Sequence, residues 1–112
     1  MTELKITSDE AFARALESSR GLLCYFSTLS CSVGEALEPK VRAMLRQDFP
    51  RLDFAWIDMN SLPAVAASNQ VFVEPTILLF VEGKEYLRKS RNIHMADLNS
   101  GLARIYELAF TD

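Results

Sequence analysis

The sequence is poor in the residues that build disulfide frameworks and metal sites. Its 112 residues include two cysteines and one histidine. Small secreted scaffolds that depend on disulfides are usually far richer in cysteine. One histidine and two cysteines also provide no recognisable ligand spacing for zinc. We therefore expect neither a disulfide framework nor a bound metal.

Long apolar runs and a surplus of positive charge are missing as well. No apolar run approaches the roughly 18 residues that span a bilayer, and residues 1–5 lack the apolar core of a signal peptide. The net charge is −3, with 12 basic and 15 acidic residues, which gives no electrostatic reason to expect nucleic acid or an anionic membrane as partner. No glycine-rich phosphate loop is present. We expect a cytoplasmic protein without a cofactor.

What the sequence does contain is enough apolar side chain for one core. Hydrophobic residues make up 49% of the chain and charged residues 24%, as is ordinary for soluble globular proteins. A chain of this length buries roughly two-thirds of the surface that its unfolded form exposes. We therefore expect residues 1–112 to form a single domain.

Strand and helix patterns alternate along the chain. We predict strands at 4–6, 22–26, 52–58, 76–81 and 85–87, and helices from a cap at 7–10 to 19, from 33 to 49, from 62 to 69 and from 95 to 109. Thr7 and Glu10 have the spacing of a capping box. The order β-α-β-α-β-α-β-β-α predicts an α/β fold, with a mixed central sheet and helices on both faces.

Two residues qualify this pattern. Strand 22–26 is almost continuously apolar, which indicates a central strand buried on both faces, so Cys24 should be a small buried hydrophobe. Pro39 falls within the second helical stripe. Either it kinks a helix that has already begun, or the helix begins at Glu38 with proline at its first position. We favour the kink, because the apolar stripe begins before the proline.

Cys31 lies in the run of residues 30–35, where an apolar strand gives way to the second helix. Backbone N–H groups and the helix dipole favour an anion at a helix N-terminus, and the thiolate is the nucleophilic form of cysteine. The hydroxyls of Ser30 and Ser32 can add hydrogen bonds to it. The sequence thus predicts a reactive thiol at this position.

These residues give the chain a resemblance to the thioredoxin family over nearly its whole length. The family places Cys-x-x-Cys at a helix start, a proline five residues after the second cysteine, and a cis-proline before a threonine and an apolar strand. Cys31, Gly34, Pro39 and Pro75 occupy those positions without a gap. The resemblance implies thiol–disulfide exchange with a protein thiol or disulfide, with Cys31 as nucleophile and a cis-proline at Pro75 beside it.

Gly34 stands where the resemblance requires the resolving cysteine, and it has no side chain. Thiol–disulfide exchange within one chain needs a second sulfur within reach, and Cys24 is expected to lie inside the core. If Cys31 acts, an external thiol such as glutathione or a partner cysteine must release the mixed disulfide. We therefore interpret the run as a monothiol site.

Other positions also depart from the family. Tyr25 matches the buried acid that helps to move protons, and Phe54 was matched to its lysine partner, while Ser30 replaces a tryptophan. Glu35 and Glu74 place carboxylates near the site, which should raise the pKa of the thiol.

The predicted docking surface is altered too. Val73 and Arg91 stand where the family has small residues, so together with Ser30, Ser32 and Glu74 they are candidate partner-binding residues. His94, with Asp97 three residues later, is better explained as a helix cap than as a catalytic base.

Two functions remain open from the sequence. The first is a monothiol redox protein that forms mixed disulfides. The second is a non-catalytic binding module that keeps the fold for protein interaction.

Overall fold

The computed structural model describes residues 1–30 and 32–111. Within this part of the chain the strands form one five-stranded sheet, built from β1 (Thr2–Lys5), β2 (Gly21–Ser27), β3 (Asp53–Asp58), β4 (Thr76–Val81) and β5 (Lys84–Ser90). The helices are α1 (Asp9–Ser18), α2 (Ser32–Asp48), α3 (Pro63–Ser68) and α4 (Met95–Phe110). The predicted order of elements is confirmed.

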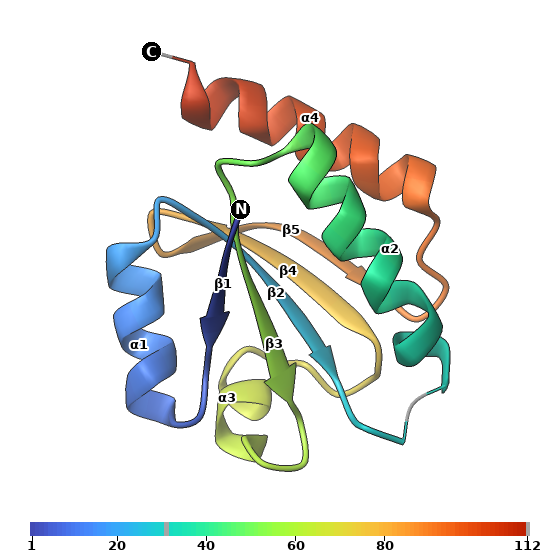
Figure 1. Cartoon of the computed structure of the whole chain (residues 1–112). Coiled ribbons are helices and arrows are strands. Elements are labelled where there is room, and N and C mark those ends of the chain that lie inside the picture. The colour runs from blue at the N-terminus through green and yellow to red at the C-terminus, as the bar shows by residue number, and fades with distance from the viewer. Residues whose placement is uncertain (31, 112) are drawn as a thin grey trace.

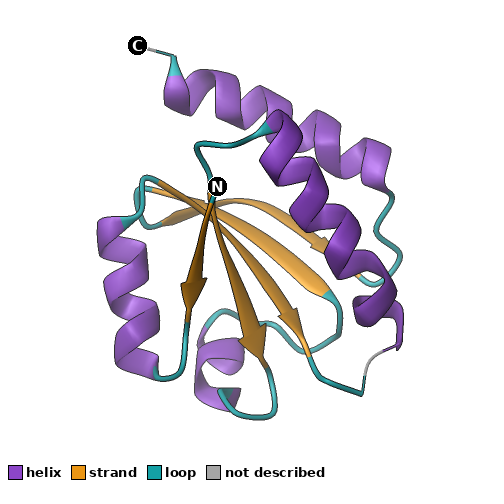
Figure 2. Ribbon diagram, viewed as in Figure 1, coloured by secondary structure: helices purple, strands orange, loops and turns teal. Residues whose placement is uncertain are grey.

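The sheet is mixed, and β2 lies at its centre. The strand order is β1-β3-β2-β4-β5. β1 and β2 run parallel to β3, whereas β4 is antiparallel to both β2 and β5. All seven residues of β2 are buried. Helices cover both faces, with α1 and α3 on one side and α2 and α4 on the other (Figures 1 and 2).

Alternation along β2 divides the interior into two cores. Leu22, Cys24 and Phe26 belong to the core under α1 and α3, whereas Leu23 and Tyr25 belong to the core under α2 and α4. Successive side chains of a strand point to opposite faces, which explains why a continuous apolar run is needed here. The prediction that Cys24 is buried is confirmed, since its exposed fraction is 0%.

Several predicted boundaries need correction. The first strand is Thr2–Lys5 and not 4–6, and the last strand continues from the turn to Ser90. Ser8, not Thr7, caps α1, because its Oγ accepts a hydrogen bond from the backbone N–H of Ala11 at 3.0 Å. His94 occupies the N-cap position of α4, but its side chain makes no capping hydrogen bond. The predicted capping role of the imidazole is therefore wrong.

α2 runs without interruption from Ser32 to Asp48, with Pro39 inside it. A helix that begins at Glu38 is thereby excluded, and the helix that begins before the proline is confirmed. The kink itself stays a prediction. The continuous helix matters for the site, because Leu37 of this helix lines a pocket with residues 91–94.

Candidate functional site

The candidate site gathers at the end of the sheet where β2 ends and β4 begins. β2 ends at Ser27, and α2 begins at Ser32. Ser30 is exposed, and its hydroxyl lies 3.2 Å from that of Thr28. The proposed nucleophile Cys31 lies outside the described residues, as do the predicted roles of the Ser32 and Glu35 side chains. Gly34 falls in the first turn of α2.

The segment before β4 supplies a second part of the site. The peptide bond between Glu74 and Pro75 is cis. Thr76 Oγ1 donates a hydrogen bond to the carbonyl of Val73 at 2.7 Å, which closes the turn around the proline. Pro75 is buried, Val73 is half-buried and Glu74 is exposed.

Arg91 joins this segment through its backbone. Its N–H donates a hydrogen bond to the carbonyl of Pro75 at 2.9 Å, next to the pairing of Thr76 with Ser90 in the sheet. Arg91 has φ of 63°, in the left-handed region that favours glycine. The structure thus brings Val73, Glu74, Pro75 and Arg91 together.

A shallow pocket adjoins Arg91, and we call it the α2–α4 pocket. It has a volume of about 360 Å³ and is lined by Leu37 of α2 and by Arg91, Asn92, Ile93 and His94 of the loop that leads into α4. Leu37 and Ile93 are half-buried, while Arg91, Asn92 and His94 are exposed. Two apolar side chains therefore lie beside a cation at the edge of the site. Sequence reasoning missed Leu37 and Ile93, because only the tertiary fold brings the helix against the loop.

The interior behind the site is aromatic. Tyr25 is completely buried, and its ring lies 6.4 Å from that of Phe54, centroid to centroid. In the sheet register, however, Tyr25 lies opposite Trp56. Trp56 shares the face of Phe54 because it is two residues further along β3, and both belong to the core under α2 and α4. An aromatic side chain occupies either position, so neither can supply a buried base.

The buried thiol is held in its neutral form. Burial raises the pKa of Cys24 far above that of a free thiol, because a thiolate would lose its hydration in an apolar core. Cys24 lies in the core under α1 and α3, on the opposite face of the sheet from Tyr25. The expectation that it is a poor substitute for a resolving cysteine agrees with this placement.

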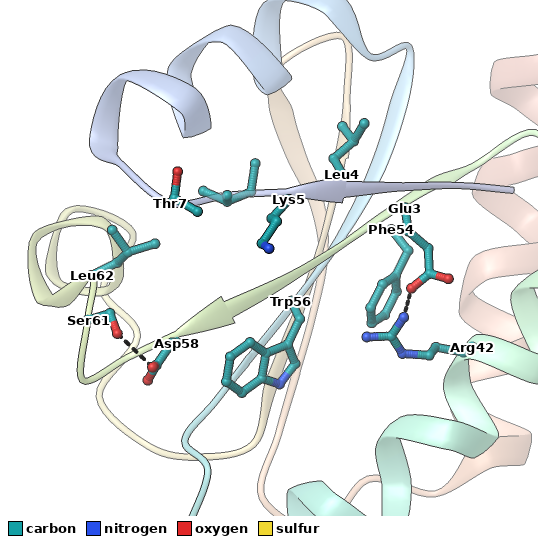
Figure 3. Close-up of a pocket in the computed structure, with 11 residues that line it drawn as sticks. Glu3, Leu4, Lys5, Thr7, Arg42, Phe54, Trp56, Asp58, Ser61 and Leu62 are labelled. Carbon is teal, nitrogen blue, oxygen red and sulfur yellow. Dashed lines mark hydrogen bonds and ion pairs between the residues drawn. The ribbon is translucent and has the colours of Figure 1, made fainter.

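A larger pocket lies between β1, β3 and α2 (Figure 3), with a volume of about 510 Å³. Its wall includes Phe54, Trp56 and Arg42. The Arg42 guanidinium lies 4.4 Å from the Phe54 ring centroid, and it forms ion pairs with Glu3 and Glu38. The Arg42 cation in this pocket is therefore already paired with carboxylates of the chain itself.

Large apolar side chains are exposed near the site. Leu29, in the loop after β2, is 84% exposed, and Phe72, in the loop before β4, is 74% exposed. Both precede a candidate site segment in the sequence. Neither was singled out from the sequence, because exposure of an isolated apolar residue leaves no periodic signal.

Among the residues that the structure describes, no group of three or more His, Cys, Asp or Glu side chains could hold a metal ion. A separate search of these residues finds no helix with the length and apolar character needed to cross a membrane.

Comparisons with known proteins agree with the fold. The thioredoxin family model matches residues 3–104. The chain is 37% identical over 84 residues to a thioredoxin-like protein of Bacillus subtilis, YdfQ, which covers 75% of this chain and 74% of that protein. It is 31% identical to Thioredoxin-1 of Saccharomyces cerevisiae, over 76% of this chain and 80% of the relative. Among solved structures, thioredoxin NaTrxh of Nicotiana alata superposes with a TM-score of 0.82 at 24% identity, over 91% of this chain and 90% of that one.

Proposed function

The chain belongs to the thioredoxin family, and we propose that it works as a monothiol member that forms mixed disulfides through Cys31. The family acts on protein thiols and disulfides, which makes a cysteine-bearing protein the natural partner. The single observation that carries the proposal is Gly34: it falls in the first turn of α2, where a resolving sulfur is needed and glycine has none.

The proposed exchange needs a partner disulfide and one further thiol, which ends in a new disulfide with the partner sulfur, both from outside the chain. The Cys31 thiolate attacks one sulfur of a partner disulfide, so that a Cys31–partner bond forms and the partner's own bond breaks. The displaced thiolate takes up a proton. A second thiolate, from glutathione or another cysteine of the partner, then attacks the partner sulfur and releases Cys31 in its reduced form.

The position of Cys31 in the sequence supports nucleophilic chemistry. It directly precedes Ser32, the first residue of α2, and a thiol at a helix N-terminus has a lowered pKa. The exposed carboxylate of Glu74 on the adjacent segment acts in the opposite direction. We propose a cytoplasmic setting, where cellular thiols keep such a site reduced.

Trapping with glutathione disulfide, followed by mass measurement of the intact protein, tests the proposal. Wild type should gain one glutathione, and Cys31→Ser should gain none. Cys24 provides an internal control, because its buried thiol should react only after unfolding. Failure of native wild type to form any mixed disulfide would contradict the monothiol function.

Turnover provides the second arm of the test. Wild type should not catalyse reduction of a protein disulfide by a dithiol reductant, because Gly34 cannot resolve the intermediate. Gly34→Cys should gain an intramolecular disulfide and modest activity. Efficient turnover by wild type without added monothiol would contradict the proposed need for an external thiol.

A non-catalytic binding module is the second candidate. It is favoured by the aromatic interior behind the site, where Tyr25 contacts Phe54 in place of a proton-moving acid, and by the exposed Leu29 and Phe72. If Cys31→Ser captures the same partner proteins from cell extracts as wild type does, this second function is supported and the monothiol function is not.

A further inference from the structure

Arg91 combines exposure, an unusual backbone and an unpaired charge. Its side chain is exposed, and within the described part of the chain its guanidinium makes no ion pair or hydrogen bond. Its backbone is nevertheless fixed, because the N–H donates to the carbonyl of Pro75 at 2.9 Å. The backbone of Arg91 is thus held in place, while no described group of the chain binds its guanidinium.

The left-handed backbone of Arg91 points to a use for the side chain. At φ of 63°, a residue with a Cβ is strained relative to glycine. Strained residues of this kind gather at functional sites. At Arg91 a long cationic side chain stands where glycine would fit without strain.

The pocket between β1, β3 and α2 and the α2–α4 pocket differ in what surrounds their arginine. Arg42, in the larger pocket, is paired with Glu3 and lies over the Phe54 ring (Figure 3). It is also paired with Glu38 of α2. The α2–α4 pocket contains Arg91, and none of the lining residues that the structure describes is a carboxylate. Among the described side chains, Arg91 therefore has no counter-ion such as Glu3 and Glu38 provide for Arg42.

The other residues that line the α2–α4 pocket indicate which groups a ligand would present beside a negative charge for Arg91. Leu37 and Ile93 are half-buried and apolar, and Asn92 adds an amide. Two acidic residues stand close to this region in the chain. Glu74 precedes Pro75, and Asp97 lies in the first turn of α4. Neither is part of the pocket lining or paired with Arg91 in the described structure. Charge complementarity thus favours a carboxylate that lies beside an apolar side chain.

We propose that the α2–α4 pocket docks an acidic segment of a protein partner, with Arg91 binding a carboxylate and Leu37 and Ile93 contacting a neighbouring apolar side chain. Guanidinium suits this task because its fork of N–H donors matches carboxylate geometry. The inference goes beyond the proposed function, because this docking requires no thiol chemistry. An acidic residue of a disulfide-bearing partner would bind Arg91 and hold that partner beside the candidate site.

Two matched peptides without cysteine test the docking in wild type. One carries a glutamate next to a leucine, and the other has glutamine in place of that glutamate. The acidic peptide should bind about fivefold more tightly, which is the upper range for an exposed ion pair, and the preference should shrink with added salt. Equal affinities for the two peptides at low salt would overturn the proposal.

Methyl resonances locate the binding. The acidic peptide should shift the methyl signals of Leu37 and Ile93, which line the pocket. Shifts confined to other parts of the molecule would overturn the assignment of the site. Shifts of these methyl groups by glutathione, with none from either peptide, would overturn the assignment to a protein partner.

Four variants separate the local ion pair from other effects. Arg91→Gly should abolish the acidic preference, whereas Arg91→Lys should keep part of it, because a point charge remains. Gln70→Gly is the backbone control, since Gln70 also has a left-handed φ, of 57°. Arg104→Gln is the charge control, because Arg104 is exposed on α4 outside the pocket. Both controls should keep the full preference.

The controls also decide how failure is interpreted. Equal loss of the preference in Arg91→Gly and Arg104→Gln would mean that only the overall charge matters, and the pocket assignment would be wrong. Because the peptides lack cysteine, none of these outcomes depends on Cys31. Loss of glutathione trapping with intact peptide preference would therefore contradict the monothiol function alone.

Discussion

The interior behind the site and the rim around it differ in the side chains that they present. In the interior, Tyr25 and Phe54 fill the space with packed aromatic rings, so that no charge is held there. At the rim, Arg91 brings a cation to a position anchored on the Pro75 carbonyl. The interior behind the site is therefore aromatic, whereas the rim carries a cation.

The comparison indicates where this chain has been specialised. Buried groups can assist proton transfer only if they titrate, and an aromatic pair in a dry core does not titrate near neutral pH. Exposed side chains on fixed backbone can instead select partners at little cost to packing. We therefore expect substitutions in the interior to change mainly stability and those at the rim to change mainly recognition.

The largest effect should come from returning an acid to the interior. Tyr25→Asp should lower the free energy of unfolding by at least about 4 kcal/mol, because the ring leaves a cavity and the carboxyl is buried. Tyr25→Phe keeps the ring and should cost about 1 kcal/mol. Urea unfolding of both variants measures the difference, and similar losses for the two would mean that the interior tolerates polarity.

The pH dependence of Tyr25→Asp sharpens this test. An apolar site should raise the carboxyl pKa of the folded variant above the unfolded value of about 3.9. Stability is then lost as pH rises from the unfolded toward the folded pKa. The deficit relative to wild type should be smaller at about pH 5 than at about pH 8. A deficit that does not change with pH would argue against burial of the charge.

A smaller effect is expected at Cys24. Burial raises the pKa of its thiol, so the folded chain keeps the proton while the unfolded thiol loses it above about pH 8.5. Wild type should therefore lose about 1.4 kcal/mol of stability per pH unit above that point through this group.

Cys24→Ala isolates this contribution. At neutral pH it should cost about 1 kcal/mol through lost packing, and the cost should nearly vanish at about pH 9. Cys31 is present in both proteins and cancels in the difference. Denaturant unfolding across this pH range provides the measurement. A constant difference would show that Cys24 titrates in the folded protein as it does in the unfolded chain.

The smallest effect should be at the rim. Arg91→Gly relieves about 1–2 kcal/mol of left-handed strain but gives the unfolded chain more freedom, worth about 0.4–1 kcal/mol. The net change should be a stabilisation of about 0.5 kcal/mol. Arg104→Gly, in the middle of α4, should instead cost about 1 kcal/mol. Thermal unfolding distinguishes the two signs, and a clear loss in Arg91→Gly would mean that its side chain supports the fold.

Much of the fold could be predicted from local patterns. Thr76–Val81 was placed at its observed boundaries, because six β-prone residues are bounded by turn signals. The thioredoxin family was recognised from Cys31, Gly34, Pro39 and Pro75, and it is confirmed by the family match. Caps were harder, since Ser8 and Thr7 offer the same chemistry one residue apart and only the direction of the hydroxyl decides between them.

The sequence by itself determined the alternation of strands and helices, the burial of β2 and the missing sulfur at Gly34, because these depend on local periodicity and residue chemistry. Only the tertiary structure decided that Trp56 lies opposite Tyr25, since register depends on how separate strands pair. It also decided that Arg91 is anchored to Pro75 and shares a pocket with Leu37. Contacts between residues so far apart in the chain leave no periodic trace in the sequence, because they form only when the sheet and its helices have packed together.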